Sequence, residues 1–269
     1  MASFVQWLPP GVQMDTKEFY DQVSPAYYRE TYEDVSTLTS IARSIRTQTV
    51  LEMMRRHVAP ESVVADLGCG PAQFADAILD GHNKYIGLDI SREMYVRTAE
   101  RLAANTRASF LEGSVESVPL PSESLDAVIC IGVLEYLPRN AEALREIHRT
   151  LRKGGIAIIS FPNLHFPMFF LRAALRPVIA PVLRRIAPQL RNTVYVSGTI
   201  HRTMSPTWFI KEVEQVPFRV LEKVTHAYFP LLFNHALPRT MVPLYLKWER
   251  LGKRLAPGMG ANFIVCLEK

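Results

Sequence analysis

The stretch Val63–Phe74, VVADLGCGPAQF, decides the fold. Its first part, Val63–Leu67, is an almost continuous apolar run, which predicts a buried parallel strand. Gly68 and Gly70 then let the backbone turn sharply and let a ligand approach it closely. The helical pattern over Ala72–Asp80 follows and presents free backbone N–H groups where the turn ends. A strand, a glycine turn and a helix in this order predict an α/β fold with a ligand site at the turn.

A second strand strengthens this interpretation. The segment Tyr85–Ser91, YIGLDIS, has a strand pattern that ends in Asp89. Asp89 lies about 20 residues past the glycines, the spacing at which a carboxylate binds a ribose hydroxyl. The turn does not have the GxGxxG pattern of a dinucleotide site, since it continues to Gln73. Asp66 at the strand end would also be unfavourable beside a pyrophosphate.

The remaining pattern predicts five more strands and several helices. Ser91 is a candidate N-cap, and Pro206 suits the first position of a helix capped by Ser205. The further strands are expected at Ala108–Leu111, Leu125–Ile131, Ile156–Phe161, Phe218–Ala227 and Asn262–Glu268, and the further helices at Arg92–Ala104, Arg139–Leu151 and from Pro206 through Val216.

Four motifs in this order resemble the class I S-adenosylmethionine (SAM) dependent methyltransferases. DLGCG at Asp66–Gly70 resembles their first motif, and Asp89 their ribose-binding acid. The segment Phe110–Pro138 is similar to their third strand, adenine loop and fourth strand, and Leu151–Ser160 to the glycine turn into their fifth strand. The resemblance covers roughly residues 19–160. It implies an α/β fold with a seven-stranded, mostly parallel Rossmann-like sheet, an antiparallel last strand and helical cap insertions.

The resemblance also implies the cofactor and the residues that bind it. The cofactor would be SAM, converted to S-adenosylhomocysteine. SAM carries an amino-acid tail and no phosphate, so Asp66 is predicted to hold its ammonium group. Ala72 and Ser114 depart from the family, which often has glycine and aspartate at these positions. The predicted cofactor-binding residues are Asp66, Gly68, Gly70, Asp89, Ile90, Met94, Ser114, Val115 and Ile131.

Catalytic residues are less strongly encoded, because methyl transfer to an aligned acceptor needs a base only when the acceptor must lose a proton. Glu135 and Tyr136 end the fourth strand, where parallel-sheet sites lie. His201 and His165 are further candidates, although a lone histidine is more often a packed or surface residue. Tyr20 and Tyr27, in an N-terminal helical segment that resembles a lid, are the predicted acceptor-binding residues.

Composition limits the other classes of protein. The 269 residues carry a net charge of +5 and three widely spaced cysteines, which predicts buried thiols and a reducing, cytoplasmic location. The N-terminus lacks a basic region and an apolar core, so no signal peptide is predicted. No apolar run reaches transmembrane length. There is no HExxH, Cys/His cluster or P-loop, so no metal or phosphoryl chemistry is expected.

Charge is concentrated in one block. Between Glu146 and Glu212 there is no acid, and within it the segment 164–191 is apolar, rich in arginine and interrupted by prolines. It is interpreted as a lid over an apolar acceptor, as a membrane-surface segment, as an RNA-binding face, or as a helical hairpin that only packs on the sheet. The first two are favoured over RNA, because no known RNA module or stacking platform is present.

The sequence thus predicts an N-terminal helical lid segment at 1–58 and a methyltransferase core at 59–269, with apolar basic insertions at 164–204 and 228–258. The predicted function is SAM-dependent methylation of a small or lipid-like, natural-product type of acceptor at oxygen. Two alternatives stay open: an RNA methyltransferase, and a SAM-binding enzyme or accessory protein that does not methylate.

Overall fold

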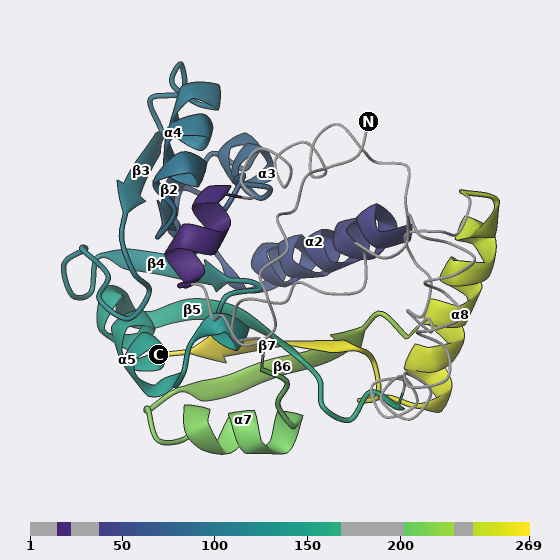
Figure 1. Cartoon of the computed structure of the whole chain (residues 1–269). Coiled ribbons are helices and arrows are strands. Elements are labelled where there is room, and N and C mark those ends of the chain that lie inside the picture. Colours follow the sequence, from purple (N-terminus) through teal and green to yellow (C-terminus); the bar gives the residue numbers. More distant parts are fainter. Residues whose placement is uncertain (1–14, 23–37, 168–201, 229–238) are drawn as a thin grey trace.

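The computed structural model describes residues 15–22, 38–167, 202–228 and 239–269 (Figure 1). The described residues build one seven-stranded sheet with the strand order β3-β2-β1-β4-β5-β7-β6. The strands are β1 (Val63–Leu67), β2 (Lys84–Asp89), β3 (Ala108–Glu112), β4 (Leu125–Cys130), β5 (Leu151–Pro162), β6 (Arg219–His226) and β7 (Asn262–Glu268).

Helices connect the strands. The α-helices are α2 (Leu38–His57), α3 (Ala75–Asp80), α4 (Arg92–Arg101), α5 (Ala141–Thr150), α7 (Pro206–Val213) and α8 (Val242–Leu255), and the short 3₁₀ helices are η1 (Leu134–Tyr136) and η3 (Arg239–Met241). Residues 16–22 are also helical. Ser91 caps α4 as predicted, because its side chain accepts the backbone N–H of Met94.

The topology confirms the predicted sheet. β1 pairs in parallel with both β2 and β4, while β7 lies antiparallel between β5 and β6. From β1 the chain continues to β2 and β3, toward one edge of the sheet, whereas from β4 it continues to β5, toward the other edge. In open α/β sheets a ligand binds in the crevice beyond the carboxyl ends of such a pair of strands.

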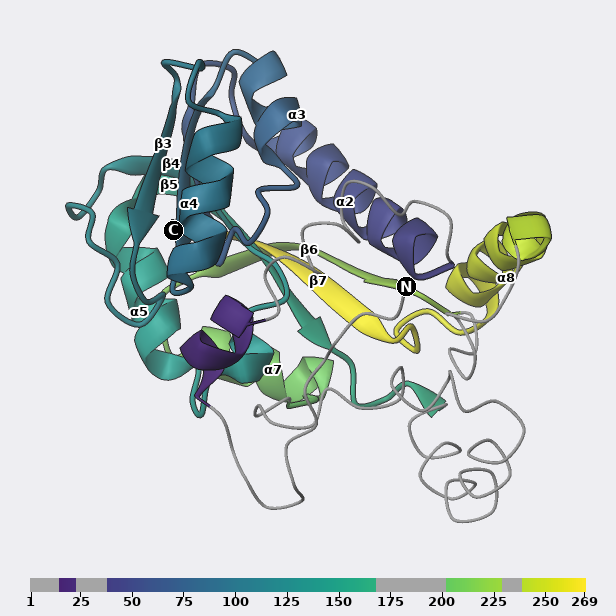
Figure 2. The ribbon, with the colours of Figure 1, turned by 45° about the horizontal axis from the view of Figure 1, so that its top comes forward.

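The core lies on both faces of the sheet. α2 and α3 bury Val50, Met53 and Ile78 against one face, and α5 and α7 bury Leu144 and Phe209 against the other. Figure 2 shows these two pairs of helices on opposite sides of the strands. β4 is buried at every position except Asp126, which explains why the rest of its sequence is apolar.

Several predicted boundaries differ from the structure. The predicted helix from Ala72 begins only at Ala75, because Ala72 has φ +53° and cannot continue a right-handed helix. β5 begins five residues before the predicted Ile156, because Leu151 already pairs with Leu125 ahead of a register shift. Within the predicted N-terminal helical region, residues 16–22 and α2 are helical, and residues 23–37 lie outside the described part of the chain.

Candidate functional site

The glycine turn after β1 is held against two neighbouring strands. The backbone N–H groups of Gly68 and Cys69 both donate to the carbonyl of Leu88, at 2.7 and 2.9 Å. Gly68 has φ +74°, and a Cβ at this position would lie 2.3 Å from a methyl group of Val133. A side chain at this position is therefore excluded by both conformation and contact, and the turn packs closely against Val133. Gly68 also lines the neighbouring cavity.

Asp89 ends β2 beside this turn. Its two carboxylate oxygens accept the backbone N–H of Gly70 at 2.7 Å and that of Ser91 at 2.9 Å. Burial raises the pKa of Asp89 above its usual value, while these two N–H donors favour the ionised form. The bonds fix the carboxylate at the mouth of the turn, and its remaining lone pairs are available to a hydroxyl donor.

Asp66 has a different environment. Its carboxylate is buried and accepts the hydroxyl of Tyr85 at 2.9 Å. Burial raises the pKa of Asp66 to about 7. Asp66 does not belong to the lining of the neighbouring cavity. The structure thus places this predicted ammonium-binding acid beneath the turn, in contact with the sheet.

A cavity of about 290 Å³ lies at the carboxyl ends of the central strands. It brings together residues from the ends of β1, β2, β3 and β4, from α2 and from the N-terminal helical segment. The predicted site residues that line it are Tyr20, Gly68, Gly70, Asp89, Ile90, Met94, Ser114, Val115, Ile131, Glu135 and Tyr136. His165 is exposed and lies outside this lining, and Tyr27 and His201 lie outside the described residues.

Two charged side chains of opposite sign line the cavity beside Gly132. A Cβ at Gly132 would lie 3.5 Å from Nη1 of Arg46 and 3.7 Å from Oε1 of Glu135. Neither Nε of Arg46 nor Oε2 of Glu135 has a hydrogen-bond partner among the described residues. Burial raises the pKa of Glu135 to about 7, although the charges of Arg46 and Arg202 oppose the rise. Buried polar atoms are normally paired, so this pair of groups suits a polar ligand.

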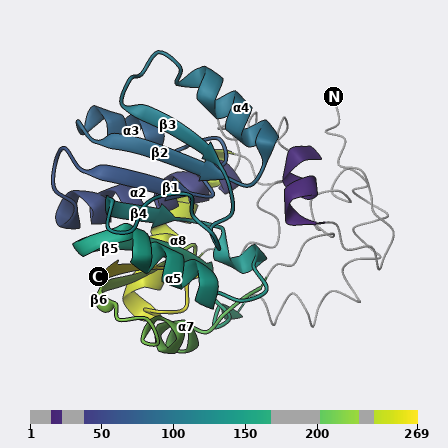
Figure 3. The same cartoon turned by 90° about the vertical axis from the view of Figure 1, so that its left-hand side faces the viewer.

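The N-terminal helical segment lies close to α4 (Figure 3), and Asp15, Thr16 and Tyr20 from it line the cavity. The ring of Tyr20 meets the ring of Tyr136 edge to face, with centroids 5.5 Å apart. Asp21 accepts the hydroxyl of Ser91 at 2.6 Å, at the N-terminus of α4. Lys17 forms a salt bridge of 2.7 Å with Glu112 at the end of β3. These contacts hold the segment across the ends of β2 and β3.

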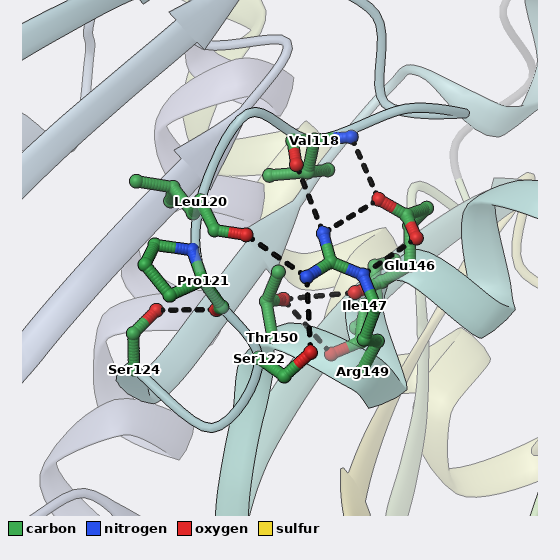
Figure 4. A network of polar contacts seen from close by, with 9 residues as sticks. All are labelled: Val118, Leu120, Pro121, Ser122, Ser124, Glu146, Ile147, Arg149 and Thr150. Atoms are coloured by element: carbon green, nitrogen blue, oxygen red, sulfur yellow. Dashed lines mark hydrogen bonds and ion pairs between the residues drawn. The ribbon is translucent and has the colours of Figure 1, made fainter.

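The loop that follows β3 carries Ser114 and Val115 and is anchored to α5 (Figure 4). The guanidinium of Arg149 donates to the carbonyls of Val118 and Leu120, both at 2.9 Å. Glu146 binds the same guanidinium at 2.7 Å and accepts the backbone N–H of Val118 at 2.8 Å. The ion pair thereby fixes a loop that would otherwise depend on turn contacts alone.

Sequence reasoning missed five polar residues of the lining, namely Asp15, Thr16, Arg46, Gln73 and Glu116. Arg46 lies within a long helix and belongs to no motif, so only the packing of α2 against the sheet brings it to the cavity. Glu116 lies two residues past Ser114, and a search for an acid at that exact family position overlooks it.

The arginine-rich block, most of segment 164–191, lies outside the described residues, as does the first part of the insertion at 228–258. Among the described helices, none is both long and apolar enough to cross a bilayer. The described residues also hold no cluster of three or more metal-binding side chains.

Comparison with known proteins agrees with the motif order. Residues 65–159 match the family model of a methyltransferase domain. A probable SAM-dependent methyltransferase of Mycolicibacterium smegmatis is 31% identical over 118 residues, which are 44% of each chain. The chain thus spans about half the length of the curated relatives it matches.

Solved structures agree on the fold over almost the whole chain. A SAM-dependent methyltransferase of Thermotoga maritima has a TM-score of 0.60 at 18% identity and covers 94% of this chain and 99% of its own. The [4+2]-cyclase SpnF has a TM-score of 0.61 at 16% identity, over 98% and 99% of the two chains. The motif order, the matched domain and this fold together support a class I, Rossmann-like SAM-dependent methyltransferase domain in this chain.

Proposed function

We propose that this protein is an enzyme that transfers a methyl group from SAM to a small or lipid-like acceptor, at an oxygen atom. The observation that supports the proposal is the composition of the cavity. The glycine turn and Asp89 form one end of it, and Tyr20 and Tyr136 belong to the same lining. One cavity therefore offers a cofactor part and an acceptor part next to each other, which is what transfer between two bound molecules requires.

The residues present fit SAM. Gly68 and Gly70 line the cavity without side chains, and the fixed carboxylate of Asp89 suits a ribose diol. Arg46 and Glu135 offer a cation and an anion at one place, and Nε of Arg46 and Oε2 of Glu135 have no hydrogen-bond partner among the described residues. An amino-acid tail carries a carboxylate and an ammonium group, so we assign Arg46 to the first and Glu135 to the second. This assignment replaces the predicted role of Asp66, which faces Tyr85.

Bound SAM supplies a methyl group that is already activated by its sulfonium, so the protein's main tasks are alignment and exclusion of water. Tyr20, Tyr136, Leu137 and Pro138 form an apolar and aromatic wall with one phenol group on each tyrosine. Such a wall fits an apolar acceptor whose hydroxyl group is oriented by a phenol. The described part of the lining contains no histidine, and we assign no dedicated base.

The test is incubation with methyl-labelled SAM and an extract of the native cells, followed by partition between organic solvent and water. Label in an organic-phase product, with formation of S-adenosylhomocysteine, supports a lipid-like or other apolar acceptor. Label that stays in water and is released by nuclease would identify RNA as the acceptor and contradict the proposal. The Asp89→Ala variant is the control, since it should lose the label in every fraction.

A second candidate is a SAM-binding protein that does not methylate. The observation in its favour is the fold shared with a [4+2]-cyclase over almost the full length of both chains. This candidate predicts saturable SAM binding without any S-adenosylhomocysteine, whichever extract fraction is added. Methyl transfer to a product that depends on Asp89 would exclude it.

A further inference from the structure

α8 carries an unusual concentration of exposed apolar side chains. Eight large apolar residues are exposed among the described residues, and five of them belong to this one helix of 14 residues. Leu255 is the most exposed of the eight, at 71%. Another of the eight, Met259, follows the helix and is 44% exposed. Singly scattered apolar residues are normal on a protein surface, but a group on one helix indicates a contact surface.

The spacing along α8 separates three stripes, because residues three or four apart lie on the same side of a helix. The inner stripe is buried and contains Tyr245 and Glu249. The second, which we call the leucine stripe, consists of Leu244, Trp248, Leu251 and Leu255, all exposed by 44% or more. The fifth exposed apolar residue, Leu246, is 41% exposed and lies outside this stripe, one turn before Arg250. The third, the basic stripe, consists of the exposed residues Lys247, Arg250 and Arg254.

The outer surface of α8 is therefore apolar and positive. The helix contains a single acid, Glu249, and its side chain is 4% exposed. Glu249 accepts the backbone N–H groups of Ala227 and Tyr228, at 3.0 and 2.8 Å, which ties the helix to the end of β6. The carboxylate of Glu249 also lies 3.8 Å from the ammonium group of Lys253, but it forms no ion pair with the described residues of the basic stripe.

α8 also adjoins the candidate active site. Tyr245 packs against Ile41 and Ile45 of α2, and the residue after Ile45 is the cavity-lining Arg46. Figures 1 and 2 show α8 at the periphery of the described structure, at the far end of α2 from α3. A surface that contacts α8 from outside would thus be one helix away from the cavity.

We propose that α8 docks the protein onto an anionic membrane surface. A helix with Trp and Leu on one side and Lys and Arg beside them binds in the interfacial plane, where the apolar side chains enter the acyl boundary and the cations meet the headgroups. A single convex ridge fits a bilayer better than it fits a protein partner, which needs a patch of about 800 Å² on each side. The proposal stands on α8 alone and does not require the proposed methyl transfer.

The test is sedimentation of the full chain with vesicles of phosphatidylcholine and phosphatidylglycerol, and with vesicles of phosphatidylcholine alone. We expect pelleting with the anionic vesicles that weakens at high salt. The triple variant Leu244→Gln, Leu251→Gln, Leu255→Gln should lose it. The triple variant Lys247→Gln, Arg250→Gln, Arg254→Gln should weaken it by about fivefold for each cation removed.

Matched controls keep the result specific. Trp208→Gln removes an exposed apolar side chain of α7 (53% exposed), and Lys84→Gln, Lys153→Gln, Lys223→Gln removes the same charge from the sheet. Both controls should pellet like the parent protein. Thermal unfolding of every variant confirms that it is folded.

Three results would overturn the proposal. The first is equal pelleting of the parent and the leucine-stripe variant. The second is a loss of pelleting only when Arg172, Arg176, Arg184 and Arg185 become glutamine, which would place the contact in the 164–191 segment. The third is a parent protein that does not bind vesicles but dimerises in solution, while the leucine-stripe variant is monomeric. This result would make the leucine stripe an interface with a second copy of the chain.

Discussion

Asp66 and Asp89 end neighbouring parallel strands, yet their carboxylates have opposite surroundings. Asp89 is held by two backbone N–H groups at the cavity, whereas Asp66 is buried against a tyrosine hydroxyl. The sequence predicts the positions of both acids, because each follows an apolar run that has the pattern of a strand. It does not predict the hydrogen bond between Asp66 and Tyr85, because this bond depends on the register that pairs Tyr85 with Val64 and Asp66 with Gly87.

Replacement of Asp66 tests its buried environment. Burial raises its pKa from 3.8 to about 7, so the folded state holds this proton more tightly than the unfolded state. Stability is therefore lost as the pH rises between these two values. We expect Asp66→Asn to melt at a higher temperature than the parent at pH 8, with the difference shrinking toward pH 4. Asp80→Asn, an exposed acid of α3, is the control, and an equal shift at both pH values would contradict the account.

The charge of Glu135 should control the affinity for SAM. Its pKa is raised to about 7 by burial, while Arg46 from α2 and Arg202 ahead of α7 face it, with the neutral thiol of Cys130 nearby. Below this pH the carboxyl is neutral and loses its attraction for an ammonium group. We expect the dissociation constant of SAM to rise up to about tenfold per pH unit below 7.

Calorimetric titration of SAM between pH 6 and pH 8 measures this dependence. Glu135→Gln should bind weakly and show no dependence in this range, while Glu142→Gln on α5 should behave like the parent. A Glu135→Gln variant with unchanged SAM affinity and a lowered turnover number would instead make Glu135 a catalytic base.

Among the elements, the strands were predictable and the loops that complete the site were not. β1 and β7 have their predicted limits, because buried strands have apolar sequences of the right length. The extension of β5 to Leu151 and the turn before α3 depend on pairing and on a left-handed Ala72. The anchoring of the loop after β3 by α5 is a contact between distant segments, which a local pattern does not encode.

The Arg149 anchor should be necessary for that loop. Its guanidinium holds two loop carbonyls and Glu146 at once, so Arg149→Lys loses the forked geometry although it keeps the charge. We expect a loss of about 1–3 kcal/mol in the free energy of unfolding. Amide hydrogen exchange in residues 113–122 should become faster, while exchange in β1 should not. Arg145→Lys is the control, because Arg145 lies on the same helix and forms an exposed ion pair with Glu142.

The N-terminal helical segment should retain the cofactor. Lys17→Ala and Asp21→Ala together remove the salt bridge with Glu112 and the hydrogen bond with Ser91. We expect faster dissociation of S-adenosylhomocysteine in stopped-flow measurements, with the association rate little changed. Glu18→Ala, which alters an exposed residue of the same segment, should dissociate like the parent. Equal dissociation rates for the parent and the Lys17→Ala, Asp21→Ala variant would show that the segment does not close the cavity.

At the scale of the whole molecule, the sheet assembles a site from six separate parts of the chain. The reversal of chain direction between β1 and β4 leaves a crevice, and α2 and the N-terminal segment bring Arg46 and Tyr20 to it. The class of fold could be predicted from the order of four motifs. The position of Arg46 at the cavity and the exposed surface of α8 could not be predicted. Both depend on which face of a helix packs against the core.

The most direct test of the central claim is a SAM titration of three proteins, the parent, Asp89→Ala and Asp80→Ala. Because Asp89 is fixed at the cavity by the glycine turn, we predict that Asp89→Ala weakens SAM binding at least tenfold, while Asp80→Ala binds like the parent. The melting temperature of the parent should rise with SAM concentration, as binding to the folded state requires. Equal SAM affinity of all three proteins, or no SAM binding by a folded parent, would contradict the assignment of this cavity.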